Sequence, residues 1–167
     1  MIAVEAIDSP IGPLTLAFED EVLVSVEFDK GPARRLSWVK RQFEGRELIE
    51  RPADSEAAQA LKAYFIDPAT DFSHIRLKLY GADFQIQVWE MLRRIPVGET
   101  AAYGTIARMI GQPGASQAVG RANGDNPIPV IVPCHRVIGM DGSLTGFGGG
   151  LERKTWLLDH ESGGRLI

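Results

Sequence analysis

The sequence predicts an α+β protein in which a small antiparallel sheet precedes a mostly helical second half. Two observations support this fold class. Short apolar runs separated by turn residues fill the beginning of the chain, a pattern typical of strands joined in hairpins. From about residue 82 the chain consists of short amphipathic segments punctuated by glycine, a pattern typical of short helices. We therefore expect two domains, 1–81 and 82–167.

The first domain is expected to open with a meander of three strands. Its apolar runs lie at 2–7, 13–18 and 22–28, and turn-forming residues separate them. These spacings predict two consecutive hairpins. A weak helical pattern follows at 33–44.

Two further elements are expected in this domain. An apolar stripe at helical spacing predicts a helix over 55–66, with Asp54 as its N-cap. Residues 75–80 alternate between apolar and polar, which predicts a strand that ends at Gly81.

The second domain is expected to contain short helices and one buried strand. Apolar residues recur at helical spacing in most of its segments, whereas one run, Ile-Pro-Val-Ile-Val, is entirely apolar. The expected elements are helices at 83–94, 102–110, 115–123 and 151–160, an apolar strand at 128–132, and a glycine-rich loop at 142–150.

The second and third of these helices resemble a helix-turn-helix. Gly111 stands where a helix ends in left-handed geometry, and a tight turn leads to the next helix. That next helix is rich in small residues, among them Ala118 and Gly120. Small residues allow the backbone of a helix to come close to another segment of the protein or to a bound molecule. Tight internal packing and close contact with a nucleic-acid groove both fit this pattern.

The charge distribution leaves DNA binding open for the second half. The net charge of −4 argues mildly against a nucleic-acid-binding protein. However, residues 1–82 carry 14 acidic and 10 basic residues, whereas residues 83–167 carry 8 of each. DNA affinity depends on local neutralisation of phosphates, so we expect weak binding with a shallow salt dependence.

Nothing in the sequence predicts a membrane protein. No apolar run approaches the roughly 18 residues of a membrane span, and the N-terminus carries early acids and no basic segment, so no signal peptide is expected. A single cysteine suits a reducing compartment, and we expect a cytoplasmic protein.

Cys134, in the segment 131–139 that reads Ile-Val-Pro-Cys-His-Arg-Val-Ile-Gly, is the main candidate for chemistry. One thiol cannot form an internal disulfide, and it is a poor start for a structural zinc site, so no metal is expected. It is either a buried inert thiol or a nucleophile. Pro133 favours a strand-to-turn junction, where backbone N–H groups and the imidazole of His135 stabilise a thiolate.

These features together resemble one family. The helix-turn-helix-like pair, the turn Asp125-Asn126-Pro127, the sequence Pro-Cys-His-Arg, the segment Thr-Gly-Phe-Gly-Gly-Gly and the terminal helix are similar to those of methylated-DNA–protein-cysteine methyltransferases, the O6-alkylguanine repair proteins. The resemblance covers residues 82–161, and the first half fits more loosely. It implies a ribonuclease H-like first domain and a winged helix-turn-helix second domain.

The resemblance implies a single-turnover transfer of an alkyl group from O6-alkylguanine, and less well from O4-alkylthymine, to Cys134. A free thiol is only a few per cent ionised at neutral pH, so it needs activation. The side chains of adjacent residues on a helical turn point in different directions, so a direct contact between Cys134 and His135 is sterically unfavourable. A water molecule that bridges the two side chains fits this geometry. In the family the histidine acts as a base through water and Glu161 orients it. No cofactor is implied.

The resemblance also assigns residues that handle the base. Tyr103 matches the tyrosine that donates a hydrogen bond to the purine, and Asn126 matches the residue that ties the recognition helix to the active-site loop. Phe147, Gly148 and the carbonyl of Val137 match the groups that surround the flipped guanine. Arg136 is expected to be structural.

DNA contact is implied for the helix at 115–123, which enters the minor groove while the damaged nucleotide is flipped out. The expected partner is double-stranded DNA that contains O6-alkylguanine, bound by a monomer. The residues assigned to this contact are Ser116, Gln117, Ala118, Gly120 and Arg121.

Gln117 departs from the family, which usually has an arginine at this position to fill the vacated base stack. Glutamine brings no cation, and Arg121, one turn further on, is expected to reach phosphates instead. We therefore expect weaker flipping or weaker DNA affinity than an arginine gives. Phe147 likewise replaces a common tyrosine.

The main alternative is a non-catalytic, damage-sensing protein of the alkyltransferase-like class, which replaces the cysteine. Cys134 argues against it. A Cys-His hydrolase would need a distant base, and nothing marks His74 or His160 as one. A winged-helix regulator with an incidental thiol would carry base-reading side chains on its recognition helix.

Overall fold

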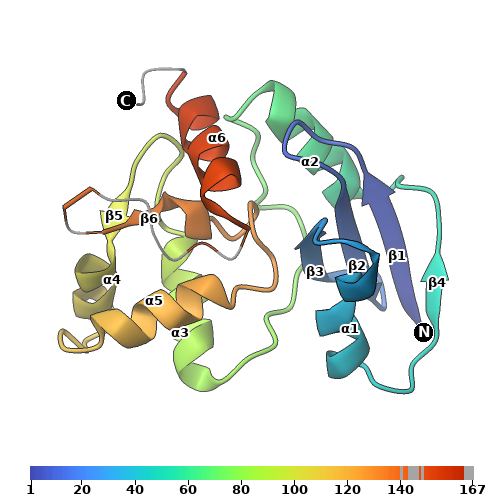
Figure 1. Cartoon of the computed structure of the whole chain (residues 1–167), viewed down its shortest axis with the longest axis horizontal. Helices are drawn as coiled ribbons and strands as arrows, with labels where there is room; N and C mark the ends of the chain where they lie inside the picture. Colours follow the sequence, from blue (N-terminus) through green and yellow to red (C-terminus); the bar gives the residue numbers. More distant parts are fainter. Residues whose placement is uncertain (140, 143–146, 148, 164–167) are drawn as a thin grey trace. The chain divides into compact units, whose positions relative to one another are not determined.

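A computed structural model of the protein describes residues 1–139, 141–142, 147 and 149–163. Its contacts divide the chain into two compact units, Met1–Leu79 and Tyr80–Ile167. The division falls two residues before the boundary expected from composition. The α+β fold class is confirmed, with a small sheet in the first unit and mostly helices in the second (Figure 1).

The first unit is built on a four-stranded sheet of order β3-β2-β1-β4. Strands β1 (Ile2–Ile7), β2 (Leu14–Glu19) and β3 (Val22–Phe28) pair antiparallel, as the apolar runs predicted. Asp20 and Glu21 both have positive φ, the geometry of a two-residue hairpin turn. The sequence missed β4 (Leu48–Glu50), which pairs parallel with β1 at the sheet edge.

Three expectations for the first unit need correction. The weak helix at 33–44 is two short pieces, η1 (Pro32–Arg34) and α1 (Ser37–Gln42), because Leu36 between them is left-handed. Residues 75–80 make only an isolated bridge, Leu77 to Leu23, and no strand.

The cap of the next helix was also placed one residue early. Helix α2 spans Glu56–Ile66, and its N-cap is Ser55 rather than Asp54. The Ser55 hydroxyl accepts a hydrogen bond from the Ala58 amide at 3.1 Å. Both residue types suit this position, so composition could not choose between them.

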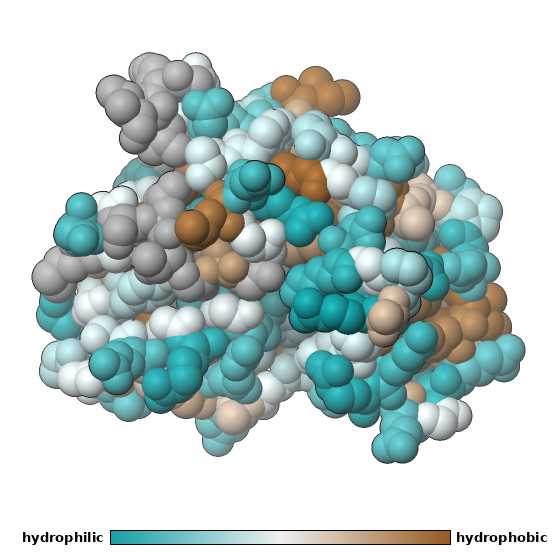
Figure 2. Space-filling model, viewed as in Figure 1, coloured by the Kyte–Doolittle hydropathy of each residue, from teal (hydrophilic) through white to brown (hydrophobic). Residues whose placement is uncertain are grey.

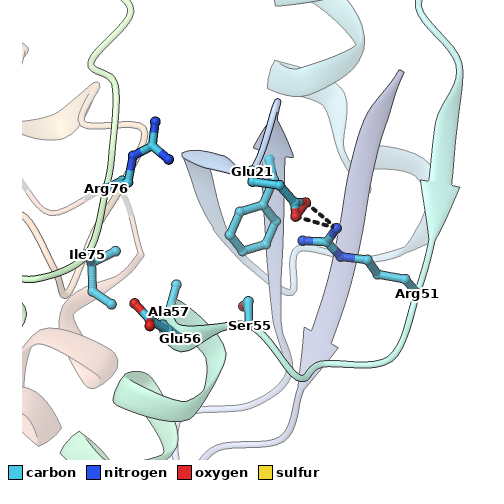
Figure 3. Close-up of a pocket in the computed structure, with 8 residues that line it drawn as sticks. Glu21, Arg51, Ser55, Glu56, Ala57, Ile75 and Arg76 are labelled. Atoms are coloured by element: carbon cyan, nitrogen blue, oxygen red, sulfur yellow. Dashed lines mark hydrogen bonds and ion pairs between the residues drawn. The ribbon is translucent and has the colours of Figure 1, made fainter.

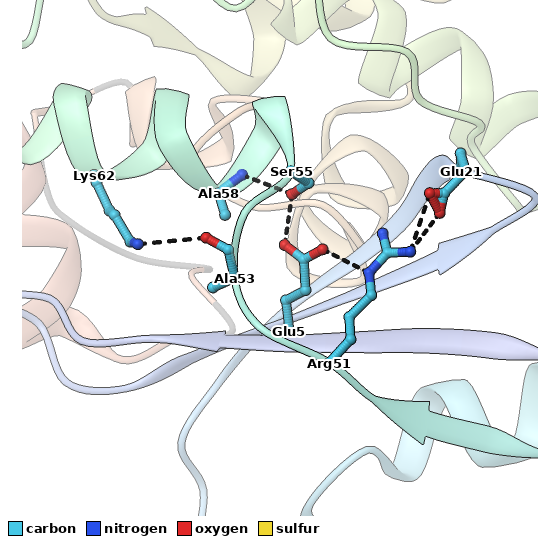
Figure 4. Close-up of polar contacts among 7 residues, drawn as sticks. All are labelled: Glu5, Glu21, Arg51, Ala53, Ser55, Ala58 and Lys62. Carbon is cyan, nitrogen blue, oxygen red and sulfur yellow. Dashed lines mark hydrogen bonds and ion pairs between the residues drawn. The ribbon is translucent and has the colours of Figure 1, made fainter.

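A polar cluster joins α2 to the sheet in the first unit (Figure 4). Glu5 on β1 is buried and accepts hydrogen bonds from Ser55 Oγ at 2.5 Å and Arg51 Nε at 2.8 Å. Arg51 also pairs with Glu21 and stacks over the ring of Phe18. A cavity of about 370 Å³ beside this cluster is lined by both acidic and basic side chains (Figure 3).

The second unit contains α3 (Asp83–Leu92), α4 (Tyr103–Met109), α5 (Ser116–Gly124) and α6 (Leu151–Glu161), close to the expected helices. Gly111, between α4 and α5, has a φ of 78° as its position predicted. The buried indole of Trp89 on α3 donates to the Ala122 carbonyl of α5 at 2.8 Å, which fixes α5 against α3. The sequence missed a short parallel pair, β5 (Ala101–Ala102) with β6 (Val137–Ile138).

The expected strand at 128–132 is instead a buried turn. Val132 donates its amide to the Ile128 carbonyl at 3.0 Å, and Val130 has a φ of 73°. Pro129 cannot donate to a ladder, which disfavours a central strand. An apolar run of this length is buried in either case, so apolarity alone could not separate the two.

One face of the molecule is shown in Figure 2. On the face that Figure 2 shows, hydrophilic side chains cover much of the area and apolar residues gather in smaller groups. Among the described helices, none is both long enough and apolar enough to cross a membrane.

Candidate active site

Cys134 begins a short 3-10 helix, η2 (Cys134–Arg136), directly after the buried turn. Its side chain is in the core, 3% exposed. The Cys134 amide donates to the Val132 carbonyl at 2.8 Å, and backbone hydrogen bonds of Cys134 and His135 act to lower the thiol pKa, as expected for this turn. The thiol is therefore positioned by a rigid turn and η2 rather than by the mouth of a strand.

Asn126 holds that turn closed. Its Oδ1 accepts from the Ile128 amide at 3.0 Å and its Nδ2 donates to the Val132 carbonyl at 2.8 Å. Its side chain also hydrogen-bonds the Cys134 thiol, which acts to lower the thiol pKa. The residue expected to tie α5 to the nucleophile thus lies where it contacts both the turn and the sulfur.

His135 is fully buried and lies against Glu161, the last residue of α6. His135 Nε2 and Glu161 Oε2 are 2.8 Å apart. Arg136 donates hydrogen bonds from Nε and Nη2 to the same carboxylate, at 2.8 and 2.9 Å, and from Nη1 to the Ile95 carbonyl. An ionised Glu161 requires the proton on Nε2, which leaves His135 Nδ1 as an acceptor.

The pKa shifts in this cluster follow from burial and pairing. Burial opposes ionisation of Glu161, but the hydrogen bonds from His135 and Arg136 outweigh it and hold its pKa well below the usual range. Burial lowers the pKa of His135, against the hydrogen bond and charge of Glu161. At neutral pH the cluster therefore holds a carboxylate, a neutral imidazole and a guanidinium.

The Cys134 thiol is protonated at rest. Burial raises its pKa to about 11, although the Asn126 hydrogen bond and the charge of Lys154 act in the opposite direction. A thiolate must therefore be generated during the reaction. His135 Nδ1 is buried and has no hydrogen-bond partner among the described residues, which suits an acceptor that takes up a proton.

Sequence reasoning missed two buried polar residues beside Cys134. Asn123 on α5 donates Nδ2 to the Cys134 carbonyl at 3.2 Å, and Lys154 on α6 donates Nζ to the Val137 carbonyl at 2.5 Å. A signal was present for both, because Asn123 lies four residues after the buried Val119, and Lys154 lies seven before Glu161.

The residues assigned to DNA all lie on α5. Gln117 and Arg121, one turn apart, are both exposed. Ser116, Ala118 and Gly120 are half-buried. A Cβ on Gly120 would lie 3.8 Å from the Tyr103 ring, so this part of α5 packs close to the start of α4.

The structure describes three of the four other residues that were expected to contact the base. Tyr103 is half-buried at the first position of α4, and Phe147 and Val137 are buried. Gly148 lies outside the described residues. No group of three His, Cys, Asp or Glu side chains within the described part of the chain forms a metal site.

Comparison with known proteins identifies the two units. Residues 2–79 match the ribonuclease-like domain of 6-O-methylguanine DNA methyltransferase, and residues 83–163 match its DNA binding domain. The chain belongs to this family. The resemblance inferred from Pro-Cys-His-Arg and its surroundings is confirmed.

Individual relatives agree over almost the whole chain. A methylated-DNA–protein-cysteine methyltransferase of Mycobacterium tuberculosis is 49% identical over 164 residues, covering 96% of this chain and 93% of the relative. One from Shigella flexneri is 39% identical over 160 residues, with 94% of each covered. The structure of M. tuberculosis OGT in complex with DNA matches with a TM-score of 0.83 and 47% identity, over 96% of this chain and 93% of that one.

Proposed function

We propose that this protein repairs DNA by transferring the alkyl group of O6-alkylguanine to Cys134, once per molecule. The observation that carries the proposal is a buried Cys134 followed in the chain by a buried His135 whose Nε2 is fixed by Glu161, in a chain that belongs to the methyltransferase family. A thioether has no chemical route back to a thiol within these residues. The protein is therefore an alkyl acceptor as well as a catalyst.

In the proposed step His135 Nδ1 takes the thiol proton, through one water, as the thiolate attacks the alkyl carbon. The bond from carbon to guanine O6 breaks while the bond to sulfur forms. The leaving guanine takes up a proton from water, and the imidazolium of His135 later returns its proton to the solvent. Tyr103 donates a hydrogen bond to the purine and so stabilises this leaving group. Glu161 stabilises the imidazolium and keeps its orientation, in the manner of a triad.

The base is proposed to reach this site by flipping out of duplex DNA, because O6 is inaccessible within the stack. Helix α5 supplies the exposed Gln117 and Arg121 for DNA contact. The carbonyls of Cys134 and Val137, each fixed by a buried donor, are proposed to meet the guanine amine, and Phe147 the ring. We propose a monomer that acts in the reducing cytoplasm, where a lone thiol survives.

Mass spectrometry tests the function directly. The protein is incubated with duplex DNA containing O6-methylguanine, and the peptide that holds Cys134 is analysed for one added methyl group. The Cys134→Ser variant is expected to lose transfer completely while it keeps most of its DNA affinity. Repair without a protein adduct would refute the proposal.

Gln117 offers a test of how the base is presented. We expect Gln117→Arg to raise the repair rate on duplex DNA several-fold, because a cation at this position adds phosphate and base-stack contacts that Gln117 lacks. The rate on a short single strand, where no flipping is needed, serves as the control. An unchanged or slower duplex rate would contradict this reading.

A further inference from the structure

Gly81 occupies a place in the fold that leaves no room for a side chain. It is the second residue of the second unit and lies two residues before α3 begins. Its backbone does not adopt the left-handed geometry that favours glycine. A Cβ at this position would instead lie 2.6 Å from two atoms of the Trp89 ring and 2.9 Å from Gln85 Oε1. Glycine is therefore required here for close approach and not for its conformational freedom.

Both neighbours of Gly81 are held in place. Gln85 Oε1 accepts a hydrogen bond from the Ala82 amide at 2.9 Å, which fixes it at the start of α3. The Trp89 indole is 1% exposed in a close-packed core, and its N–H donates to the Ala122 carbonyl of α5. Gly81→Ala would therefore displace the indole, the Gln85 side chain or the segment that leads into α3.

The indole connects this glycine to the last turn of α5. The Ala122 carbonyl accepts from Trp89 Nε1 at 2.8 Å, and the next residue, Asn123, donates to the Cys134 carbonyl at 3.2 Å. Two consecutive residues of α5 are thus bonded to α3 and to the nucleophile segment respectively. Arg121, which precedes them, is exposed and belongs to the residues assigned to DNA. The position of the indole therefore influences how the DNA-facing helix lies relative to the nucleophile.

We propose that Gly81 and Trp89 are positioning residues for alkyl transfer. Gly81 leaves room for the indole, and the indole holds α5 at the separation from Cys134 at which a flipped base meets the thiol. This inference rests on the proposed function, because that function requires α5 to present the base. A displacement of about 1 Å far from the reacting atoms can slow a reaction by roughly 10²-fold, so pressure on the indole should be visible in the rate.

Gly81→Ala tests the proposal through single-turnover methyl transfer at saturating methylated duplex, with DNA affinity measured separately. The rate at saturation should fall by roughly tenfold or more. Gly114→Ala is the matched control, because Gly114 also lacks left-handed geometry, and no described atom beyond its chain neighbours lies within 4 Å of an added Cβ. Its rate should stay within twofold of the original. An unchanged rate in Gly81→Ala would overturn the proposal.

Trp89→Phe shows whether Gly81 acts through the indole. Phenylalanine keeps an aromatic ring in the core but lacks both the N–H and the outer ring edge that a Cβ at position 81 would meet. The Ala122 carbonyl keeps the Asp125 amide as a donor, at 3.1 Å. Trp89→Phe should slow transfer by roughly tenfold. Gly81→Ala should then add less than a twofold loss in the double variant, whereas two losses that multiply would contradict the proposal.

Iodoacetamide separates positioning from a loss of structure. The Cys134 side chain is 3% exposed, so a variant with a loosened core should be alkylated faster, whereas a small shift of α5 leaves the thiol buried. We expect the labelling rate of both variants to match that of the unaltered protein. Trp38→Phe, at a half-buried tryptophan of the first unit, is the control for the aromatic substitution. If Gly81→Ala does not fold, Trp89→Phe decides: unchanged transfer, or slower transfer with faster labelling, would overturn the proposal.

Amide hydrogen exchange distinguishes a failure of this inference from a failure of the proposed function. Gly81→Ala should raise exchange in α5 more than in α6, without any DNA present. That change in a protein that forms no methyl adduct would leave the role of Gly81 in placing α5 standing and refute the repair function. Methyl transfer at the original rate in both variants would refute the inference and leave the repair function intact.

Discussion

Each unit of the molecule buries one glutamate against an arginine, but the third partner differs. In the first unit Glu5 receives Arg51 and the hydroxyl of Ser55 (Figure 4). In the second, Glu161 receives Arg136 and the imidazole of His135. Both glutamate side chains are 1% exposed.

The difference shows that the ion pair alone does not make a catalytic site. Ser55 caps α2, so the cluster around Glu5 anchors a helix to a sheet. His135 stands next to Cys134, so the cluster around Glu161 sets the protonation of an imidazole beside a nucleophile. The same charge arrangement is structural in one place and chemical in the other, according to what its carboxylate orients.

Glu161→Gln should have the largest effect on methyl transfer among the substitutions in the two clusters. An amide provides no charge to hold the proton on His135 Nε2, and it leaves the guanidinium of Arg136 without its carboxylate. We expect methyl transfer to slow by roughly 10²-fold or more. Single-turnover kinetics with excess protein over methylated duplex measure this, and DNA affinity is the control. A loss of less than threefold would show that Glu161 does not act through His135.

The two clusters also differ in how much of them the sequence predicts. The specific string Pro-Cys-His-Arg identified the family, and through it His135 and Glu161. Glu5 was invisible, because it sits in an apolar run where strand alternation gives no reason for a buried charge. Its partners Arg51 and Ser55 lie about 50 residues away, and only the fold brings them together.

Local sequence patterns predicted the long helices and strands. They failed where hydrogen bonds from a side chain determine the backbone conformation. The meander and the four helices of the second unit follow from periodicity. The buried turn after Asn126 does not, because an amide side chain replaces ladder hydrogen bonds there. The short strands β4 to β6 have too few residues to show a pattern.

Glu5→Gln is the counterpart substitution in the first unit. It leaves Arg51 facing an amide in a buried position, so we expect the unfolding free energy of that unit to fall by about 2 kcal/mol. Amide hydrogen exchange in β1 and α2 reports the loss. The methyl-transfer rate should stay within twofold of the original. A large loss of transfer would mean that Glu5, too, serves the chemistry.

Acid should destabilise the second unit more than the first. The folded pKa of His135 lies below its ordinary value of 6.5, so below pH 6.5 the unfolded chain binds a proton that the folded unit does not. Stability of the second unit should therefore fall by up to about 1.4 kcal/mol per pH unit. Glu161 adds a second loss below about pH 4.5, because its folded pKa is depressed.

Hydrogen exchange between pH 7 and pH 5 tests this for each unit separately. Amides of α6 should lose protection over this range, after correction for the intrinsic exchange rate. Amides of β1 and α2 in the first unit are measured in the same experiment as the comparison. His135→Gln should remove the loss between pH 6.5 and 5. Equal loss in both units would contradict the assignment to His135.

Ser55→Ala should have the smallest effect, about 1 kcal/mol, the usual cost of an N-cap. The variant loses the acceptor for the Ala58 amide and one donor to Glu5. Because Ser55 and Glu5 share a hydrogen bond, the double variant with Glu5→Gln should cost less than the sum of the two. Strict additivity would show that Ser55 caps α2 independently of Glu5. The cluster in the first unit would then be a simple ion pair, without the three-part coupling proposed for Glu161, His135 and Cys134.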